Sequence, residues 1–280
     1  MLKDAVDSVP SGMQQRFPNL IGIELARLEL ERRGETVAAA ERTSYAAAIQ
    51  AIRDREDCCD FAQASILRIL YRYPESKILP AEIREELLGT LQADRYWMDE
   101  PGGPGGCYFT ENHQILFHSN EYLAANLLGP DAVFGNDGRS GQWHREHAEQ
   151  MLTRWLDWRM RFSFSEWNSS CYYAEDLAAL LNLYDFAPDE VIRKKAGDVI
   201  SLIMFHTLLN SFDGDLGGTQ GRTYFRQAIN PALQDVRGLQ WLYLGSWRRA
   251  GTVSFRPRVR GVILLRDSRR PGRHQRGRSS

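Results

Sequence analysis

Residues 58–72 read CCDFAQASILRILYR, and within them Ala62, Ile66, Ile69 and Leu70 recur at the spacing of one helical face. Apolar residues three and four positions apart predict an amphipathic α-helix. No stretch of the chain shows the strict alternation of a half-buried strand, so we expect an all-α fold in which β-structure is minor. The same periodicity predicts helices at 20–33, 44–54, 80–91, 114–128, 142–160, 173–184, 188–211 and 231–244.

Polar loops separate these helices at regular intervals, at about 101–113, 161–172 and 212–228. The first loop begins within DEPGG at 99–103, because Gly and Pro oppose continuation of a helix there. Two helices lie between consecutive loops, and two antiparallel helices return the chain to the end that it left. We therefore expect the three loops at one end of an (α/α) toroid, complete or incomplete, or of an α-solenoid.

The charge of the chain is distributed unevenly. The formal net charge over 280 residues is −1, yet residues 247–280 contain eleven Arg, no Lys and one acid, Asp267. Residues 1–246 then carry 24 basic and 35 acidic residues, a net charge of about −11. Phosphate contacts need clustered Lys and Arg, so this acidic body argues against a nucleic-acid partner.

The Arg-rich segment 247–280 has no amphipathic period. We expect residues 1–246 to form the helical domain, and 247–280 to be a disordered or out-of-frame tail, with an anion-binding tail as the alternative. A ring of six hairpins needs about twelve helices and the periodicity gives about nine, so the domain is expected to be an incomplete toroid.

No secretion signal and no apolar run of about 20 residues is visible, which predicts a cytoplasmic chain without a membrane partner. His144 and His147 have i,i+3 spacing, but the sequence offers no obvious third ligand. We therefore expect neither a metal nor a cofactor. The cysteines lack zinc-site spacing and are expected to be reduced: Cys58, Cys59, Cys107 and Cys171.

The first candidate site is TENHQ at 110–114. Thr110 is a good N-cap residue, and Glu111 in a first turn complements the helix dipole. Capping does not account for Asn112 and His113, which are therefore candidates for chemistry.

The second candidate site is FSFSEWNS at 162–169, followed by Tyr172 and Tyr173. Aromatic faces stack on sugar rings while carboxylates and amides bind hydroxyl groups, so a loop of this kind suits a glycan. A packed loop with buried aromatics and capping serines is an equal alternative. Glu166 is the best acid candidate in the chain.

The third candidate site is NSFDGDLGGTQGRTY at 210–224, whose glycines allow close approach of backbone to a ligand. Arg222 can clamp an oxyanion or carboxylate, with Tyr224 two residues further on. Local pairing of Arg222 with Asp213 or Asp215 is the alternative.

Three stretches of the chain resemble bacterial and fungal proteins of uncharacterised activity: TENHQILFHSNEYLAANLL (110–128), FSFSEWNSSCYYAEDLAALLNLYDFAPDEVIRKKA (162–196) and GTQGRTY (218–224). Those proteins look like (α/α) toroids, the architecture of six-hairpin glycosidases and of many polysaccharide lyases. The resemblance covers about 95–245 and implies a glycan substrate.

The resemblance implies two competing mechanisms. In a toroidal lyase, Asn112 would neutralise a uronate carboxylate, His113 and Tyr172 or Tyr173 would move protons, and Arg222 would assist. The motif order gives β-elimination a slight preference, although the acidic body should repel a polyanion.

In a toroidal glycosidase, Glu166 would be the acid, with Glu111 or Asp213 as the base. A third hypothesis is a non-catalytic helical scaffold that binds a glycan or a protein. An enzyme requires that His113, Glu166 and Arg222 converge on one pocket. The expected substrate-binding residues are Glu111, Trp167, Asn168, Tyr172, Asp213 and Tyr224.

Overall fold

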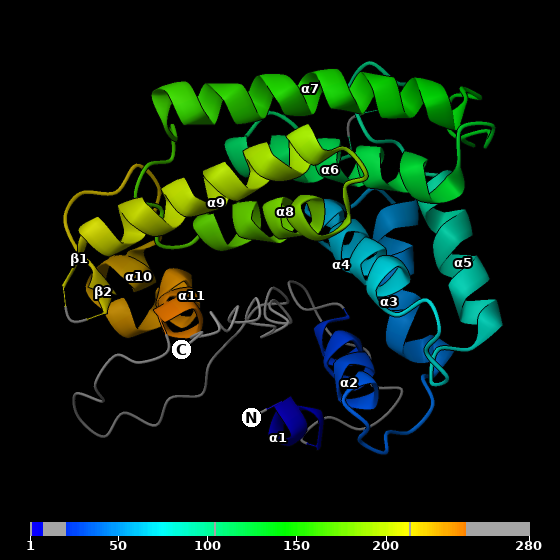
Figure 1. Cartoon of the computed structure of the whole chain (residues 1–280), viewed down its shortest axis with the longest axis horizontal. Helices are drawn as coiled ribbons and strands as arrows, with labels where there is room; N and C mark the ends of the chain where they lie inside the picture. Colours follow the sequence, from blue (N-terminus) through cyan, green and yellow to red (C-terminus); the bar gives the residue numbers. More distant parts are fainter. Residues whose placement is uncertain (1, 8–20, 104, 213, 245–280) are drawn as a thin grey trace, which may run out of the picture.

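The computed structural model describes residues 2–7, 21–103, 105–212 and 214–244, and it is mainly helical (Figure 1). Each predicted helix is present, and the observed bounds differ from the predicted ones by only a few residues. The helices are α1 (Leu2–Asp7), α2 (Gly22–Arg32), α3 (Arg42–Arg53), α4 (Cys59–Arg72), α5 (Ala81–Gln92), α6 (Glu111–Leu128), α7 (Gly141–Phe162), α8 (Tyr173–Phe186), α9 (Glu190–Leu209), α10 (Phe225–Ile229) and α11 (Asp235–Leu244).

The β-structure is minor, as expected. The strands β1 (Ser211–Phe212) and β2 (Asp215–Leu216) form a small antiparallel pair after α9, and a 3₁₀ turn (Pro231–Leu233) precedes α11. Among the described residues, no helix has both the length and the apolarity required to cross a bilayer. Asp213 and the Arg-rich segment 247–280 lie outside the described residues.

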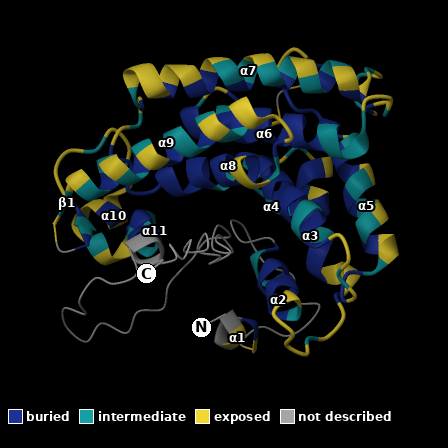
Figure 2. Cartoon of the chain, viewed as in Figure 1, coloured by how far each residue is buried: buried dark blue, intermediate teal, exposed yellow. Residues whose placement is uncertain are grey.

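The helices pack in two rows. The inner row runs from α2 through α4, α6 and α8 to α11, in which each helix contacts the next (Figure 1). The outer helices α3, α5, α7 and α9 pack against this row. Because of this packing, α6 and α8 are largely buried while α7 exposes one long face (Figure 2).

The core lies between the rows and along the inner helices. Ile66 and Leu67 of α4, Leu116 of α6 and Leu180 of α8 are fully buried in one continuous cluster. Burial of each such side chain stabilises the fold by about 1.5–3 kcal/mol. These apolar contacts fix how the inner helices sit against one another.

The hairpin arrangement brings the predicted loops together at one end. The amide of Gly221 donates to the Trp167 carbonyl at 2.8 Å, and the hydroxyls of Ser170 and Thr223 lie 2.8 Å apart. The side chain of Glu111 in turn binds the loop before α8. The expectation that the three loops share one end of the array is therefore confirmed.

Candidate functional site

The starts of α4, α6 and α8, the residues just before α4 and α8, and the loop 217–224 contribute the polar side chains at this shared end. The electrostatics relate them to one another, because His113 and Arg222 both act on the pKa of Glu166. His113 and Arg222 therefore lie close enough to Glu166 for their charges to act on it. We call the following set the mouth: Asp57, Cys58, Asp60, His113, Glu166, Tyr172, Arg222 and Tyr224.

His113 lies in the first turn of α6 and is oriented by a buried carboxyl group. Its Nδ1 atom lies 2.6 Å from Oδ2 of Asp60, and Phe61 stacks on the ring with a centroid distance of 5.6 Å. Burial alone would lower the pKa of His113, but the hydrogen bond and charge of Asp60 raise it overall. Because Asp60 engages Nδ1, the imidazole can accept a further proton only at Nε2.

Glu166 is half-buried in the loop before α8. Burial raises the pKa of its carboxyl group, and the charges of Arg222 and His113 oppose that rise. A carboxyl group with a raised pKa keeps its proton to higher pH, which suits a proton donor.

Glu111 has a structural role in this arrangement. Its two carboxylate oxygens accept hydrogen bonds from the amides of Ser165 and Glu166, at 3.0 and 2.9 Å, and it pairs with Arg159. The side chain of Glu111 is only 4% exposed. Glu111 thus anchors the loop that carries Glu166, and these contacts do not support the interpretation that it is a base or binds substrate.

Tyr172, Arg222 and Tyr224 form a cluster at the rim of the mouth. The two phenolic oxygens lie 2.5 Å apart, and Arg222 donates to the Tyr172 hydroxyl at 3.0 Å. The guanidinium also lies over both rings, 5.0 and 5.3 Å from their centroids. The alternative was pairing of Arg222 with Asp213 or Asp215. Asp215 instead pairs with Arg237 at 2.7 Å, and Asp213 lies outside the described residues.

The two adjacent tyrosines have different environments. Tyr173 is fully buried and its hydroxyl accepts a hydrogen bond from the amide of Asn168 at 2.8 Å, whereas Tyr172 reaches the rim. Asn168 is itself buried and has a left-handed backbone, with φ of 49°. Tyr173 and Asn168 therefore shape the loop, while Trp167, which is 42% exposed, remains available to a ligand.

Asn112 is buried beside His113 in the first turn of α6, which begins earlier than the predicted residue 114. Its Oδ1 atom accepts a hydrogen bond from the Thr110 hydroxyl at 2.9 Å. Thr110 takes the N-cap position of α6 without a side-chain bond to the helix amides. The hydroxyl of Thr110 thus fixes the orientation of the Asn112 amide.

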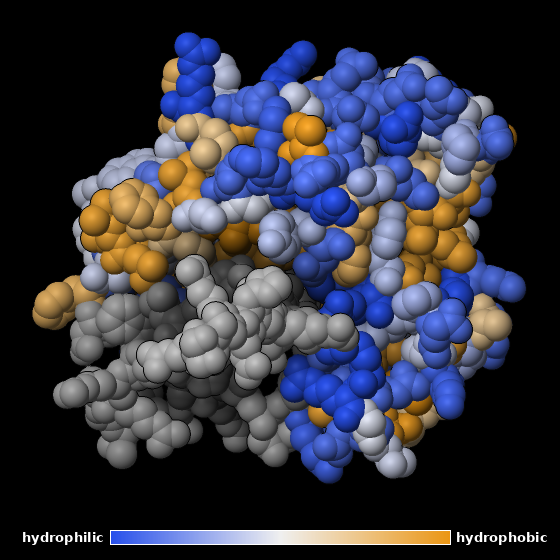
Figure 3. All heavy atoms as spheres, in the orientation of Figure 1, coloured by the Kyte–Doolittle hydropathy of each residue, from blue (hydrophilic) through white to orange (hydrophobic). Residues whose placement is uncertain are grey.

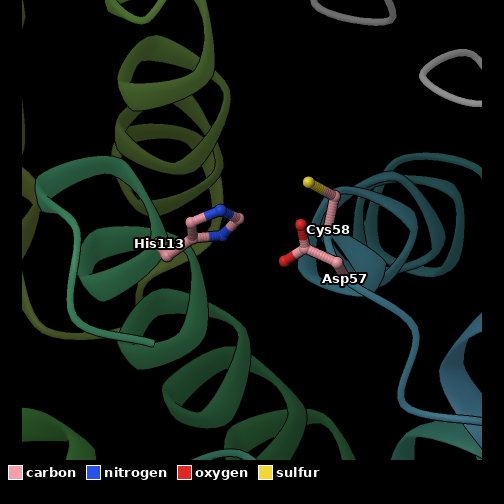
Figure 4. A group of neighbouring side chains, drawn as sticks. All are labelled: Asp57, Cys58 and His113. Atoms are coloured by element: carbon pink, nitrogen blue, oxygen red, sulfur yellow. The ribbon is translucent and has the colours of Figure 1, made fainter. Parts of the chain in front are cut away.

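Sequence reasoning missed Asp60 in the first turn of α4 and Asp57 in the turn just before it. Asp57, Cys58 and His113 offer one ligand atom each, and these atoms lie within 4.8 Å of one another (Figure 4). This set could hold a metal ion, although burial and the charges of Asp60 and Asp57 raise the pKa of the Cys58 thiol to about 12. The available signal was the position of Asp57 and Asp60 at the start of a predicted helix, as in TENHQ.

Comparison of the chain with protein-family models, with curated proteins and with solved structures gave no match.

Proposed function

We propose that the mouth binds a glycan and hydrolyses a glycosidic bond by acid–base catalysis. One observation carries the proposal: Asp60 fixes His113 as a proton acceptor in the same neighbourhood as Glu166, whose pKa is raised. Glu166 would protonate the leaving oxygen, and Nε2 of His113 would take a proton from the attacking water. The mouth would thus supply both the proton donor, Glu166, and the proton acceptor, His113.

The rim of the mouth supports a sugar as the ligand. Trp167 and Tyr224 are 42% and 44% exposed, and Tyr172 is partly exposed beside Arg222. Aromatic faces stack on the C–H faces of sugar rings, and nearby polar groups bind the hydroxyls.

The charge of the body favours hydrolysis over elimination. Residues 1–246 carry a net charge of about −11. A uronate polymer would be repelled by such a surface, whereas a neutral glycan would not. We therefore place hydrolysis first.

β-Elimination is the second candidate because one cluster favours it. Arg222 could pair with a uronate carboxylate while the Tyr172 hydroxyl, to which it donates, delivers a proton to the leaving oxygen. Burial and the contact with Tyr224 raise the pKa of Tyr172, so its hydroxyl stays protonated.

The test is a panel of neutral and uronate-containing glycans incubated with the full chain. Reducing ends are measured together with the ultraviolet absorbance of an unsaturated uronate. Reducing ends without that absorbance are expected; both signals together would instead establish elimination. Absence of any product and of any glycan binding would overturn the proposal.

Two variants assign any activity to the mouth. Glu166→Gln should lower activity by about 10²–10⁴-fold, the range for loss of a general acid. Asp198→Asn is the matched control, because Asp198 pairs with Lys194 on the exposed face of α9. Equal activity in the two variants would place the chemistry elsewhere.

A further inference from the structure

A second cluster of titratable side chains lies between α6 and α7, about two helical turns along α6 from His113. Nδ1 of His144 and Nδ1 of His147 lie 2.8 and 2.9 Å from the same atom, Oε1 of Glu121. The side chains of Glu121 and His144 are fully buried, and that of His147 is 15% exposed. Two imidazole nitrogens and a carboxylate oxygen therefore converge on one point.

The remaining nitrogen of each imidazole is held by its own carboxylate. Nε2 of His144 lies 3.2 Å from Oδ1 of Asp137, and Nε2 of His147 lies 3.3 Å from Oδ2 of Asp99. Metal-binding histidines characteristically donate one ring N–H to a carboxylate, which fixes the tautomer and leaves the other nitrogen free to bind the metal. Both imidazoles of this cluster have that arrangement.

Glu100 adds a second buried carboxylate. Its ligand oxygen lies within 4.8 Å of those of Glu121 and His144, and the residue is 3% exposed. The amides of Tyr96 and Trp97 each donate to Oε1 of Glu100 at 2.9 Å, and these bonds hold the carboxyl group in place. Among the described residues, no Lys or Arg forms an ion pair with Glu100 or Glu121.

We propose that this cluster is a structural site for a divalent transition-metal ion, ligated by Glu100, Glu121, His144 and His147. Metal–ligand bonds of about 2.0–2.2 Å place neighbouring ligand atoms roughly 3 Å apart. This matches the 2.8 and 2.9 Å that separate the two imidazole Nδ1 atoms from Oε1 of Glu121, and the Glu100 oxygen lies within 4.8 Å of the Glu121 and His144 ligand atoms. Imidazole and carboxylate ligands suit Zn²⁺ and neighbouring first-row ions.

The ion would cross-link α6, α7 and the loop before α6. Glu100 belongs to the loop before α6, Glu121 to α6, and His144 and His147 to α7. The side chain of Asp99 is 50% exposed, whereas those of Glu121 and His144 are fully buried. It is independent of the proposed glycan chemistry.

The test uses the full chain purified without chelators, with metal content measured by mass spectrometry. One ion per chain is expected, or one Zn²⁺ bound in a calorimetric titration after chelation. Zn²⁺ should raise the Tm of the chelated protein. Bound Co²⁺ should show ligand-field bands in the visible spectrum.

Variants locate the ion. Glu121→Gln and His147→Gln should each weaken Zn²⁺ binding at least 10-fold and abolish the Zn²⁺-dependent rise in Tm. His147 is partly exposed, so its variant keeps the test decisive if Glu121→Gln does not fold. The controls are His206→Gln, on α9, and Cys58→Ser, in the mouth, and both should bind Zn²⁺ as the wild type does.

Two results would overturn the proposal. One is a wild-type chain that binds neither Zn²⁺ nor Co²⁺ and whose Tm responds to neither metal nor chelator, because protons alone would then balance the carboxylates. The other is unchanged Zn²⁺ affinity in a folded His147→Gln variant, or loss of affinity in Cys58→Ser.

Discussion

The carboxylate of Glu111, at the start of α6, accepts a 2.9 Å hydrogen bond from the backbone amide of Glu166 in the loop before α8. The two residues come from different candidate stretches of the sequence, 55 positions apart. The contact explains how the Glu166 loop is held at the first turn of α6. It also makes Glu111 a residue that positions Glu166.

Glu111→Gln should therefore destabilise the fold. The change removes the negative charge that pairs with buried Arg159, and loss of one member of a buried pair costs about 3–5 kcal/mol. Urea unfolding measures the difference, with exposed Glu146→Gln as the control, for which less than about 0.5 kcal/mol is expected. Lost activity at unchanged stability would instead make Glu111 part of the chemistry.

Asp60→Asn should lower kcat about 10²-fold or more with a smaller effect on KM, because the imidazole loses the group that orients it and strengthens it as a base. The pKa of His113 is raised in the wild type, so activity should fall as the pH drops through a value above about 6.5. In the variant this acidic limb should move to lower pH. Asp54→Asn, on the exposed end of α3, is the control, and an unmoved limb would exclude His113 as the base.

Glu166→Gln should remove the limb on which activity falls as the pH rises, because the proton on the raised-pKa carboxyl group is then no longer needed. Glycosides with good leaving groups need little protonation, so they should retain far more activity than natural linkages. The ratio of the two rates in wild type and variant measures this. An equal loss for both substrates would argue against Glu166 as the acid.

Gly221→Ala should disturb the junction between the two loops of the mouth. A Cβ atom at this position would lie 2.8 Å from Cδ1 of Trp167 and 3.0 Å from the Ser165 carbonyl oxygen, so the loop must shift. We expect a Tm lowered by several degrees and at least 10-fold weaker glycan binding. Gly89→Ala, in α5 with open space around it, should instead stabilise the protein by about 0.5–1 kcal/mol.

Asp94 should make stability depend on pH. Burial raises the pKa of its carboxyl group to about 7, whereas in the unfolded chain it is about 3.9. The folded state thus binds a proton at Asp94 more tightly than the unfolded chain does. This proton binding stabilises the fold fully below about pH 4, and the stabilisation is lost as the pH rises through 7. Asp94→Asn should raise the Tm at about pH 8 and leave it unchanged near pH 4. A Tm difference that does not vary with pH between Asp94→Asn and wild type would contradict this.

The sequence predicted the helices well because their signal is local. Ile66, Ile69 and Leu70 lie three and four positions apart, which is enough to indicate one face of a helix. This signal does not depend on residues elsewhere in the chain. The regular spacing of the loops then predicted a shared end, because antiparallel pairing follows from short connections. The same signals predicted the neighbourhood of His113, Glu166 and Arg222.

The roles of individual side chains depended on partners that no local pattern identifies. Asp60 binds His113 although the two are 53 residues apart in the chain. The carboxylate of Glu111 accepts hydrogen bonds from the Ser165 and Glu166 amides. Tyr173, and not Tyr172, is buried in the core. His144 and His147 lacked a visible third ligand until α6 supplied Glu121.

What the sequence determined by itself is thus the set of helices, their alternation and the end at which the loops meet. Tertiary structure alone decided which polar groups are buried against each other. Periodicity is a property of neighbouring residues, whereas hydrogen bonding, desolvation and charge pairing act between atoms that only the packed chain brings within a few ångströms.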